Sequence, residues 1–311
     1  MTGTAVFLTG IAYELGEQEK SLADLTSFPP DVLEGLREVG VSDFRTTSRT
    51  SSQLAHASAL RTLGTLGPGR RDAVTHVIHA TNSHHDGAAT HEVGSGRLLR
   101  ALGLAKAFPL GVSLGYCANL HVALHLATAL ISAGAAGDVL VICADALGPD
   151  GDRSVSGGIS VHCDAASSVL VTRDPLPGSL RLLHTELHID PALADIDPSV
   201  NFLRHMSVFG KGCAHTTARA LSAVGSLSQD ISRVLPNNYN NRVNRGLAEI
   251  TGFSVEQVFM ANIPRLGHAL ASDNLINLAD SLELNPAEPG ERMLLLASGP
   301  NQWGVSVVEA R

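Results

Sequence analysis

The chain has 311 residues, of which 44% are hydrophobic and only 4% are aromatic. This length allows one large core or two fused halves, and small and aliphatic side chains must fill the interior. The formal net charge of −8 gives no reason to expect binding to nucleic acid or to an anionic membrane. No apolar run is long enough to span a membrane, and residues 1–10 lack the basic flank of a signal peptide.

Strand and helix patterns alternate along the first half of the chain. Residues 5–15 and 73–82 have the pattern of strands, and residues 51–67 between them have the apolar spacing of a helix. Residues 138–146 and 166–174 are apolar runs of strand length, as expected for central strands covered on both faces. A further helical face, before these two strands, is marked by Leu120, Leu124, Ala127 and Ile131.

The segment DPLPG, residues 174–178, is the best candidate boundary, because two prolines and a glycine interrupt regular structure there. It predicts an N-terminal half of residues 1–174 and a C-terminal half of residues 175–311. The patterns of the first half recur in the second in the same order: residues 72–82 resemble 229–238, residues 137–150 resemble 290–301, and residues 167–174 resemble 305–311. Such a duplication predicts an α/β fold of five layers, αβαβα, with its site between the halves.

The cysteines show no paired spacing along the chain. We interpret them as reduced thiols, which predicts a cytoplasmic protein. They are Cys117, Cys143, Cys163 and Cys213.

The duplication also predicts which polar side chains meet. The element before residues 138–146 contains GYCANL with Cys117, and the element before residues 291–298 contains RLGHALASDNL with His268. If a pseudo-twofold axis relates the halves, these two side chains approach each other. A third polar segment, LPNNYNNRV at residues 235–243, follows a strand of the second half and is expected at the same site.

Three segments resemble a known family. Residues 113–145 resemble its nucleophile segment, in which a cysteine precedes a helix and a strand. Residues 161–171 resemble its Phe-Gly-Asp-Gly-Ala-Gly segment, with Cys163 and Asp164 in the middle, and residues 301–311 resemble its Thr-Trp-Gly segment. In this order and spacing, the chain resembles the thiolase superfamily, and in particular its β-ketoacyl-acyl-carrier-protein synthase III branch. The resemblance implies a thiolase-like five-layer fold and a homodimer.

The chain departs from that family at its active-site motifs. Where the family carries His-Gln-Ala-Asn, this chain has Asn-Asn-Tyr-Asn, so the family histidine falls on Asn237. Where the family carries Gly-Asn-Thr, this chain has Gly-His-Ala, so the family asparagine falls on His268. Thiolases have a similar order, but they also use a second cysteine near the C-terminus, and residues 295–304 contain none. The resemblance therefore does not support a thiolase reaction.

The residue types favour nucleophilic chemistry at Cys117. A free thiol has a pKa of roughly 8.5, and the start of a helix beside it favours the thiolate. His268 is the candidate that takes the proton or pairs with the thiolate. The backbone N–H of Cys117 and one from the loop at residues 298–304 could form the oxyanion hole that acyl transfer needs. Asn237 offers a second polar contact to a thioester carbonyl.

Members of the family with altered active-site residues are often acyltransferases of specialised metabolism, so the resemblance implies such an enzyme here. It would move an acyl group from a carrier-protein or coenzyme A thioester, through an acyl-enzyme on Cys117, to an alcohol, an amine or a carrier thiol, with His268 as general base. We expect acyl carrier protein as the partner, because residues 42–48 match the family's coenzyme A-binding pattern only loosely. Two alternatives stay open: a decarboxylating β-ketoacyl synthase, and a non-catalytic partner subunit of such a synthase.

The resemblance places further residues at the substrate site. Asn240 belongs to the polar segment, Gly299 and Trp303 lie in the C-terminal loop, and Ala88 falls where relatives often carry a bulky aromatic side chain. We expect the small Ala88 to leave a roomier acyl pocket, which would accept a branched or aromatic acyl group. Arg242 matches an arginine on the family's carrier-docking face.

Each assignment has a structural alternative. Cys117 can be a buried small hydrophobe, His268 can be a loop histidine bonded to backbone, and Asn237 can cap a turn. No glycine-rich stretch is placed like a phosphate loop. We assign no metal and no other cofactor, because the remaining histidine clusters match no common zinc spacing: His84, His85, His162, His205 and His215.

Overall fold

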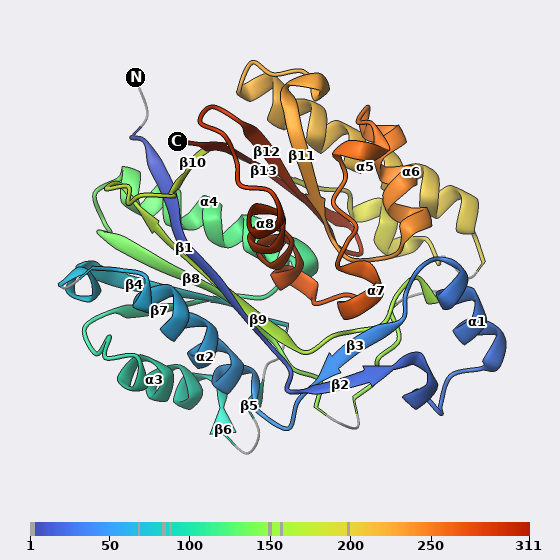
Figure 1. The fold of residues 1–311 in the computed structure, drawn as a ribbon, viewed down its shortest axis with the longest axis horizontal. Coiled ribbons are helices and arrows are strands. Elements are labelled where there is room, and N and C mark those ends of the chain that lie inside the picture. Colours follow the sequence, from blue (N-terminus) through green and yellow to red (C-terminus); the bar gives the residue numbers. More distant parts are fainter. Residues whose placement is uncertain are drawn as a thin grey trace.

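The computed structural model describes residues 4–67, 69–82, 85–86, 89–148, 151–155, 158–197 and 200–311. Strands and helices are interspersed along the described chain (Figure 1). The strands are β1 (Val6–Leu15), β2 (Gln18–Ser21), β3 (Asp43–Thr46), β4 (Val74–Ala80), β5 (His85–Asp86), β6 (Ala89–Thr90), β7 (Phe108–Val112), β8 (Asp138–Asp145), β9 (Ala165–Thr172), β10 (Leu180–Ile189), β11 (Ile231–Pro236), β12 (Arg292–Ser298) and β13 (Gln302–Ala310). The α-helices are α1 (Pro30–Glu38), α2 (Ser51–Gly64), α3 (His91–Ala101), α4 (Asn119–Ser132), α5 (Phe202–Ala223), α6 (Asn241–Thr251), α7 (Ile263–Leu266) and α8 (Asp273–Leu284).

One strand pattern occurs twice. The strands hydrogen-bond in the order β11-β12-β13-β10-β1-β9-β8-β4-β7. In the first half β4 is parallel to β8, while β8–β9 and β9–β1 are antiparallel. In the second half β11 is parallel to β12, while β12–β13 and β13–β10 are antiparallel. These are the segment pairs matched in the sequence, and the halves join where residues 6–8 of β1 pair with residues 180–182 of β10.

Helices cover the outer faces of the strands and fill the space between the halves (Figure 1). On one side α2 packs on β1, β8 and β9, and α3 packs on α2; on the other side α5 packs on β10 and β13, and α6 packs on α5. Helix α4 contacts β4 and β8 as well as β10 and β13, and α8 contacts β1 and β9 as well as β11 and β12. Because α4 and α8 each touch strands of both halves, they form a central layer. The predicted five-layer αβαβα class is therefore confirmed.

The central layer is stabilised mainly by apolar side chains, and buried polar side chains of α4 and α8, such as His121 and Asn274, hydrogen-bond the neighbouring strands. The predicted helical face of α4 is buried, and β8 and β9 are buried at every position. Removing this aliphatic surface from water stabilises the fold by roughly 25 cal/mol per Å². Two short turns precede the central helices, η3 (Tyr116–Ala118) before α4 and η8 (Leu270–Ser272) before α8, and these turns touch each other. The starts of the two helices thus meet at one place.

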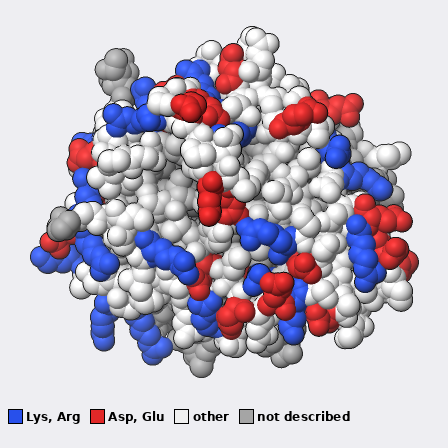
Figure 2. Space-filling view, viewed as in Figure 1, with Lys and Arg blue, Asp and Glu red and all other residues white. Residues whose placement is uncertain are grey.

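The charged side chains of the visible surface are mixed in sign (Figure 2). Figure 2 shows basic and acidic side chains interspersed over one face of the molecule. Within the described part of the chain, no helix has both the length and the hydrophobicity needed to cross a bilayer.

Candidate active site

Cys117 lies in η3, which leads directly into α4. Its side chain is 5% exposed. The preceding residue, Tyr116, has a φ of 49°, a left-handed conformation that costs a non-glycine residue on the order of 1–2 kcal/mol. Asn119 holds this turn, because its Oδ1 accepts from the Gly115 N–H at 2.7 Å. The candidate nucleophile therefore occupies a strained turn that is fixed at the start of a central helix.

His268 lies just before η8 and is 1% exposed. The preceding Gly267 has a φ of 62°, and a Cβ at this position would lie 2.5 Å from the carbonyl oxygen of Val161. Because glycine allows this close approach, the His268 N–H donates to the Val161 carbonyl at 2.8 Å, and the His268 carbonyl accepts from the Cys163 N–H at 2.9 Å. The backbone of His268 is therefore bonded to a segment of the first half.

The side chains of Cys117, His268 and Asp273 form a hydrogen-bonded relay. The Sγ of Cys117 lies 3.1 Å from Nε2 of His268, and Nδ1 of His268 lies 2.5 Å from Oδ2 of Asp273. The Asp273 carboxylate also accepts from the N–H groups of Ala269 and Asn238, each at 2.8 Å. In this geometry the imidazole can exchange a proton with the thiol, while the carboxylate holds the imidazole in one orientation.

The charges of the relay favour a reactive thiol. Burial lowers the pKa of His268, but the charges of Cys117 and Asp273 outweigh burial and raise it to about 10. An imidazolium next to Sγ stabilises the thiolate form of Cys117. The charges of the site therefore favour an imidazolium at His268 beside Sγ of Cys117.

The other cysteines lack a basic partner of this kind. Burial raises the pKa of Cys163 and Cys213 to about 12, and it also raises the pKa of Cys143. These buried thiols stay protonated at neutral pH and are inert as nucleophiles. All the cysteines are free, as interpreted from their spacing.

Asp273 is a site residue that the sequence analysis missed. It follows His268 by five residues in the stretch GHALASDN, and it is the first residue of α8. A carboxylate in the first turn of a helix is ordinarily explained by the helix dipole. Leu270, with a φ of 53°, makes the tight turn that brings the carboxylate back to the imidazole. That turn has no clear signal in the sequence.

Asn237 is buried close to the relay, but its amide is used within the chain. Its Oδ1 accepts from the Ser298 N–H at 3.0 Å, and its Nδ2 donates to the Leu270 carbonyl at 3.2 Å. Nδ2 also lies 3.4 Å from Oδ2 of Asp273. We expected this amide to face a thioester carbonyl; in the structure it connects the loops around the relay, and it would have to give up a bond to contact a substrate.

Tyr239 is a second residue that the sequence analysis did not single out. It falls where the related family has the alanine of His-Gln-Ala-Asn. Its hydroxyl lies 3.9 Å from Sγ of Cys117 and donates to the Ser298 carbonyl, and its ring centroid lies 4.9 Å from that of His268. Burial, followed by the charge of Cys117, raises the pKa of Tyr239 well above its usual value. Tyr239 therefore stays a neutral phenol that fills the space beside the nucleophile.

Asn240 and Arg242 belong to the start of α6. Asn240 caps the helix: its Oδ1 accepts from the Val243 N–H at 2.8 Å, and its Nδ2 donates to the Ile159 carbonyl at 2.6 Å. These bonds show that the Asn240 side chain caps α6, whereas we expected it to contact the substrate. Arg242 is exposed in the first turn of α6, and its role in carrier docking stays a prediction.

Gly299 and Trp303 lie behind the nucleophile turn. A Cβ at Gly299 would lie 3.2 Å from the Gly115 carbonyl, and the Gly299 N–H donates to the Gln302 carbonyl at 2.7 Å. This N–H is therefore not free for an oxyanion hole. Trp303 is buried and lines a cavity of about 270 Å³ that also includes Ala118, the residue after Cys117. Ala88 lies outside the described residues.

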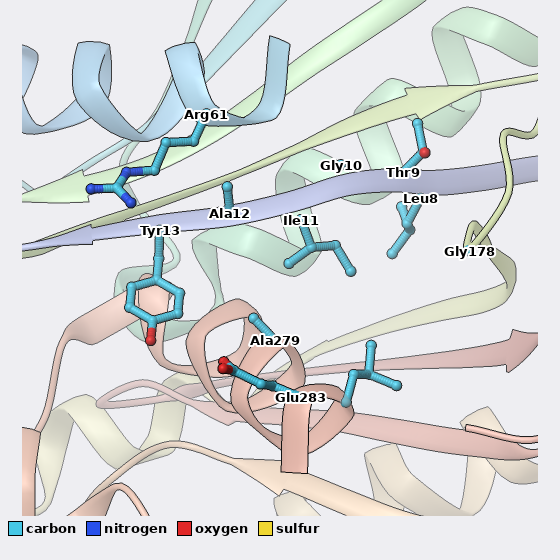
Figure 3. A pocket seen from close by; sticks show the side chains of 11 residues that line it. Leu8, Thr9, Gly10, Ile11, Ala12, Tyr13, Arg61, Gly178, Ala279 and Glu283 are labelled. Atoms are coloured by element: carbon cyan, nitrogen blue, oxygen red, sulfur yellow. The ribbon is translucent and has the colours of Figure 1, made fainter. Parts of the chain in front are cut away.

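A second cavity, of about 520 Å³, lies between β1, α2 and α8 (Figure 3). Figure 3 shows Arg61 on the α2 side of β1 and Glu283 on α8. None of the predicted site residues lines this cavity. Within the described residues, no group of three His, Cys, Asp or Glu side chains could hold a metal ion.

Comparison with known proteins places the chain in a family. Residues 114–191 match the family model described as 3-Oxoacyl-[acyl-carrier-protein (ACP)] synthase III, and residues 221–309 match the model of its C-terminal part. Together these matches span more than half of the chain.

Curated relatives carry an equivalent name, since β-ketoacyl and 3-oxoacyl denote the same group. The Streptomyces coelicolor protein "Beta-ketoacyl-[acyl-carrier-protein] synthase III 2" is 28% identical over 274 residues, which is 85% of this chain and 79% of the relative. A Vibrio vulnificus protein of the same name is 24% identical over 331 residues, with 99% of this chain and 89% of the relative covered.

Solved structures have the same fold. The structure titled ChlB3, an acyltransferase, has a TM-score of 0.84 at 19% identity, with 98% of each chain covered. The 3-oxoacyl-(acyl carrier protein) synthase III of Pseudomonas aeruginosa has a TM-score of 0.81 at 22% identity, also with 98% of each chain covered. The fold is therefore thiolase-like, and the chain belongs to the 3-oxoacyl-[acyl-carrier-protein] synthase III family.

Proposed function

We propose that this chain is an acyltransferase that carries its acyl group as a thioester on Cys117. The observation that carries the proposal is the relay of Cys117, His268 and Asp273, with 3.1 Å between Sγ and Nε2. Membership of a family of acyl-carrier-protein synthases supports a carrier-protein or coenzyme A thioester as the donor. The name of ChlB3, an acyltransferase with the same fold, agrees with this reaction class.

In the first half-reaction, the thiolate of Cys117 attacks the carbonyl carbon of the donor thioester. The tetrahedral intermediate collapses, the carbonyl C–S bond of the donor breaks, and the leaving thiolate takes the Nε2 proton of His268. Asp273 accepts the Nδ1–H of His268 and keeps Nε2 directed at the sulfur. The products are acyl-Cys117, a neutral His268 and the free carrier thiol.

In the second half-reaction, His268 becomes a base. The charge of Cys117 is the strongest of the interactions that raise the pKa of His268, and acylation removes it. The pKa of His268 therefore falls, and the neutral imidazole can accept a proton from the acceptor. The acceptor attacks the Cys117 thioester, its proton moves to Nε2, and the Cys117 thiolate leaves. The Cys117 thiolate and the His268 imidazolium are then restored.

We propose the cavity of about 270 Å³ next to Ala118 as the pocket for the acyl chain. Val122 and Trp303 supply apolar walls, and His188 stacks on Trp303 with ring centroids 5.5 Å apart. Ala118, which directly follows Cys117, lines this cavity together with Trp303, and this supports the expected contact of Trp303 with the substrate. Acceptance of a branched or aromatic acyl group stays a prediction.

We also propose that the chain pairs with a second copy of itself through β7. This strand ends the described sheet, so one side of its backbone is available for pairing. Phe108 in β7 is 63% exposed and Leu114, shortly after it, is 82% exposed. Exposed apolar side chains beside an open strand edge support a homodimer. Acyl carrier protein would contact the exposed Arg242.

A decarboxylating β-ketoacyl synthase is the second candidate, and the names of the curated relatives favour it. Decarboxylation of a malonyl thioester builds an enolate oxygen that needs donors facing it. His268 could supply one donor. The amide of Asn237, which was expected to supply another, is bonded to Ser298 and Leu270. This arrangement favours plain acyl transfer.

Intact-protein mass spectrometry tests the proposal. The full chain is incubated with a panel of acyl N-acetylcysteamine thioesters, and the adduct is mapped. We expect an acyl group on Cys117 that is lost in Cys117→Ala and kept in Cys213→Ala, a matched change of a buried thiol. Malonyl-carrier protein is then added: release of carbon dioxide with a β-ketoacyl product would establish the second candidate. If no donor gives an adduct, the result would contradict the proposal and favour a non-catalytic partner subunit.

A further inference from the structure

A second histidine lies beside the relay. His162 forms a parallel bridge with His268, through the bonds that His268 makes to the backbones of Val161 and Cys163. Residues paired in such a bridge direct their side chains to the same face. The two imidazoles stack accordingly, with ring centroids 5.7 Å apart and an interplanar angle of 29°. His162 therefore shares a face with the proposed general base.

His162 and His268 differ in exposure and in bonding. His268 is buried and bonded at both ring nitrogens, whereas His162 is partly exposed and lies nearer to the surface. The buried Nδ1 of His162 has no hydrogen-bond partner among the described residues. An unpaired buried nitrogen is costly, so a partner such as a ligand or an ordered water would stabilise it. The ring is thus placed to bond a ligand that enters toward His268.

His162 is uncharged at neutral pH. Burial lowers its pKa to about 3, and the positive charges of His268 and Arg153 act in the same direction. Asp152 and a bond to the backbone of His268 oppose them with smaller effects. A neutral imidazole carries one N–H donor and one lone-pair acceptor. This pair matches a hydroxyl, which also donates once and accepts, whereas a carboxylate or phosphate is better bound by a cation.

We propose that His162 binds the acyl acceptor and that this acceptor is an alcohol. The inference rests on the proposed acyl-transfer function. In this proposal one hydroxyl oxygen contacts a nitrogen of each ring, and the bridge between His162 and His268 keeps the two rings side by side, with centroids 5.7 Å apart. His162 holds the hydroxyl oxygen against acyl-Cys117 while Nε2 of His268 removes its proton. The oxygen bonds to the acyl carbon, the C–S bond to Cys117 breaks, and an ester leaves.

The family comparison supplies a matched variant. When Asp164 is aligned with the aspartate of the family's Phe-Gly-Asp-Gly-Ala-Gly segment, the phenylalanine falls on His162. The chain thus has hydrogen-bonding nitrogens where the family pattern has a plain ring. His162→Phe keeps an aromatic ring beside His268 and removes both nitrogens. His162→Gln keeps a donor and an acceptor, and His56→Phe makes the same change at a partly exposed histidine of α2.

The test measures how the acyl-enzyme is partitioned. The full chain is acylated with butyryl-N-acetylcysteamine and then given ethanol, ethylamine or buffer alone, and ester, amide and free acid are quantified. We expect ethyl ester from the wild type, and in His162→Phe an acylation rate within about threefold of wild type but an ester-to-acid ratio about tenfold lower, as for one lost hydrogen bond. His162→Gln should recover part of the ratio, and His56→Phe should leave it unchanged.

The outcomes separate the claims. An unchanged ester-to-acid ratio in His162→Phe, or a loss of acylation as large as the loss of ester, would overturn the role of His162 in acceptor binding. If the wild type forms amide faster than ester, with the ethylamine rate calculated for the unprotonated amine, the alcohol would be overturned as the acceptor. A wild type that forms no acyl-enzyme would instead overturn the proposed function.

Discussion

Cys117 and His268 are 151 positions apart in the chain, yet Sγ and Nε2 lie 3.1 Å apart. The contact arises because each residue precedes a helix of the central layer, Cys117 before α4 and His268 before α8. The turns η3 and η8 touch each other at the start of these helices. Neither half alone holds a complete site, so the chemistry depends on the packing of the two halves.

The first prediction concerns Asp273. Asp273→Asn removes the carboxylate that raises the pKa of His268, so the thiolate–imidazolium pair should be less populated at neutral pH. We expect the acylation rate of Cys117 to fall by about 10²–10⁴, as for other triads that lose their carboxylate. The rate is measured over a range of pH by mixing the protein with a thioester, quenching the reaction at set times and quantifying acyl-Cys117.

Asp280→Asn is the control for Asp273, because it makes the same change further along α8. Asp280 accepts bonds from Tyr13 and Asn262 and does not touch Cys117 or His268. Thermal unfolding of both variants shows how much of any rate change comes from lost stability. Full acylation activity in folded Asp273→Asn would remove the carboxylate from the mechanism.

The second prediction concerns Gly267. Gly267→Ala should destabilise the chain, because alanine is strained at a φ of 62° and its Cβ would lie 2.5 Å from the Val161 carbonyl oxygen. Gly103→Ala is the matched control: Gly103 has a φ of 72°, but nothing lies within 4 Å of its Cβ position. We expect about 1–2 kcal/mol of loss at Gly103 and more at Gly267, measured by urea unfolding. Equal losses would mean that the loop moves away without cost.

The third prediction concerns stability in acid. His121 is buried in α4, and its ring hydrogen-bonds Ser306 and Asn274. Burial lowers the pKa of His121 to about 4. Between pH 6.5 and pH 4 the unfolded chain binds a proton at this site that the folded chain does not, so the free energy of unfolding falls as pH falls. The contribution is about 3 kcal/mol. His121→Gln should therefore lose less stability than wild type between pH 7 and pH 4.5, and an equal loss would show that His121 is not responsible.

The fourth prediction concerns Tyr239. Tyr239→Phe removes the hydroxyl that donates to the Ser298 carbonyl, which should cost about 1 kcal/mol of stability. The acylation rate should change by less than about fivefold, because the Tyr239 hydroxyl lies 3.9 Å from Sγ and donates its hydrogen bond to the Ser298 carbonyl. A far larger drop in the acylation rate, with stability intact, would make the phenol a donor to the reacting groups.

Much of the fold follows from local patterns. Residues 138–145 and 165–172 are mostly apolar and are buried at every position, because strands covered on both faces expose no side to water. The repeat of these patterns after residue 178 predicts the second half. Cys117 and His268 follow from the same repeat, because equivalent positions in duplicated halves approach each other. The family resemblance agrees with both.

Hydrogen-bond partners do not follow from such patterns. Asn237 has the right type and place for a substrate contact, but its amide bonds Ser298 and Leu270, whose backbone groups only the folded loops bring near. Asp273 reads as an ordinary helix start, and its bond to His268 depends on the turn at Leu270. The stacking of His162 on His268 depends on a bridge between segments from different halves.

The main strands of the first half, their repeat in the second half and the two reactive residue types were determined by sequence alone, because hydrophobic periodicity and residue chemistry are local properties of a chain. Which carboxylate orients the imidazole, which amide is already occupied and which second histidine faces the acceptor were decided only by the tertiary structure. The physical reason is that a hydrogen bond forms over about 3 Å, and only packing decides which distant groups come within that distance.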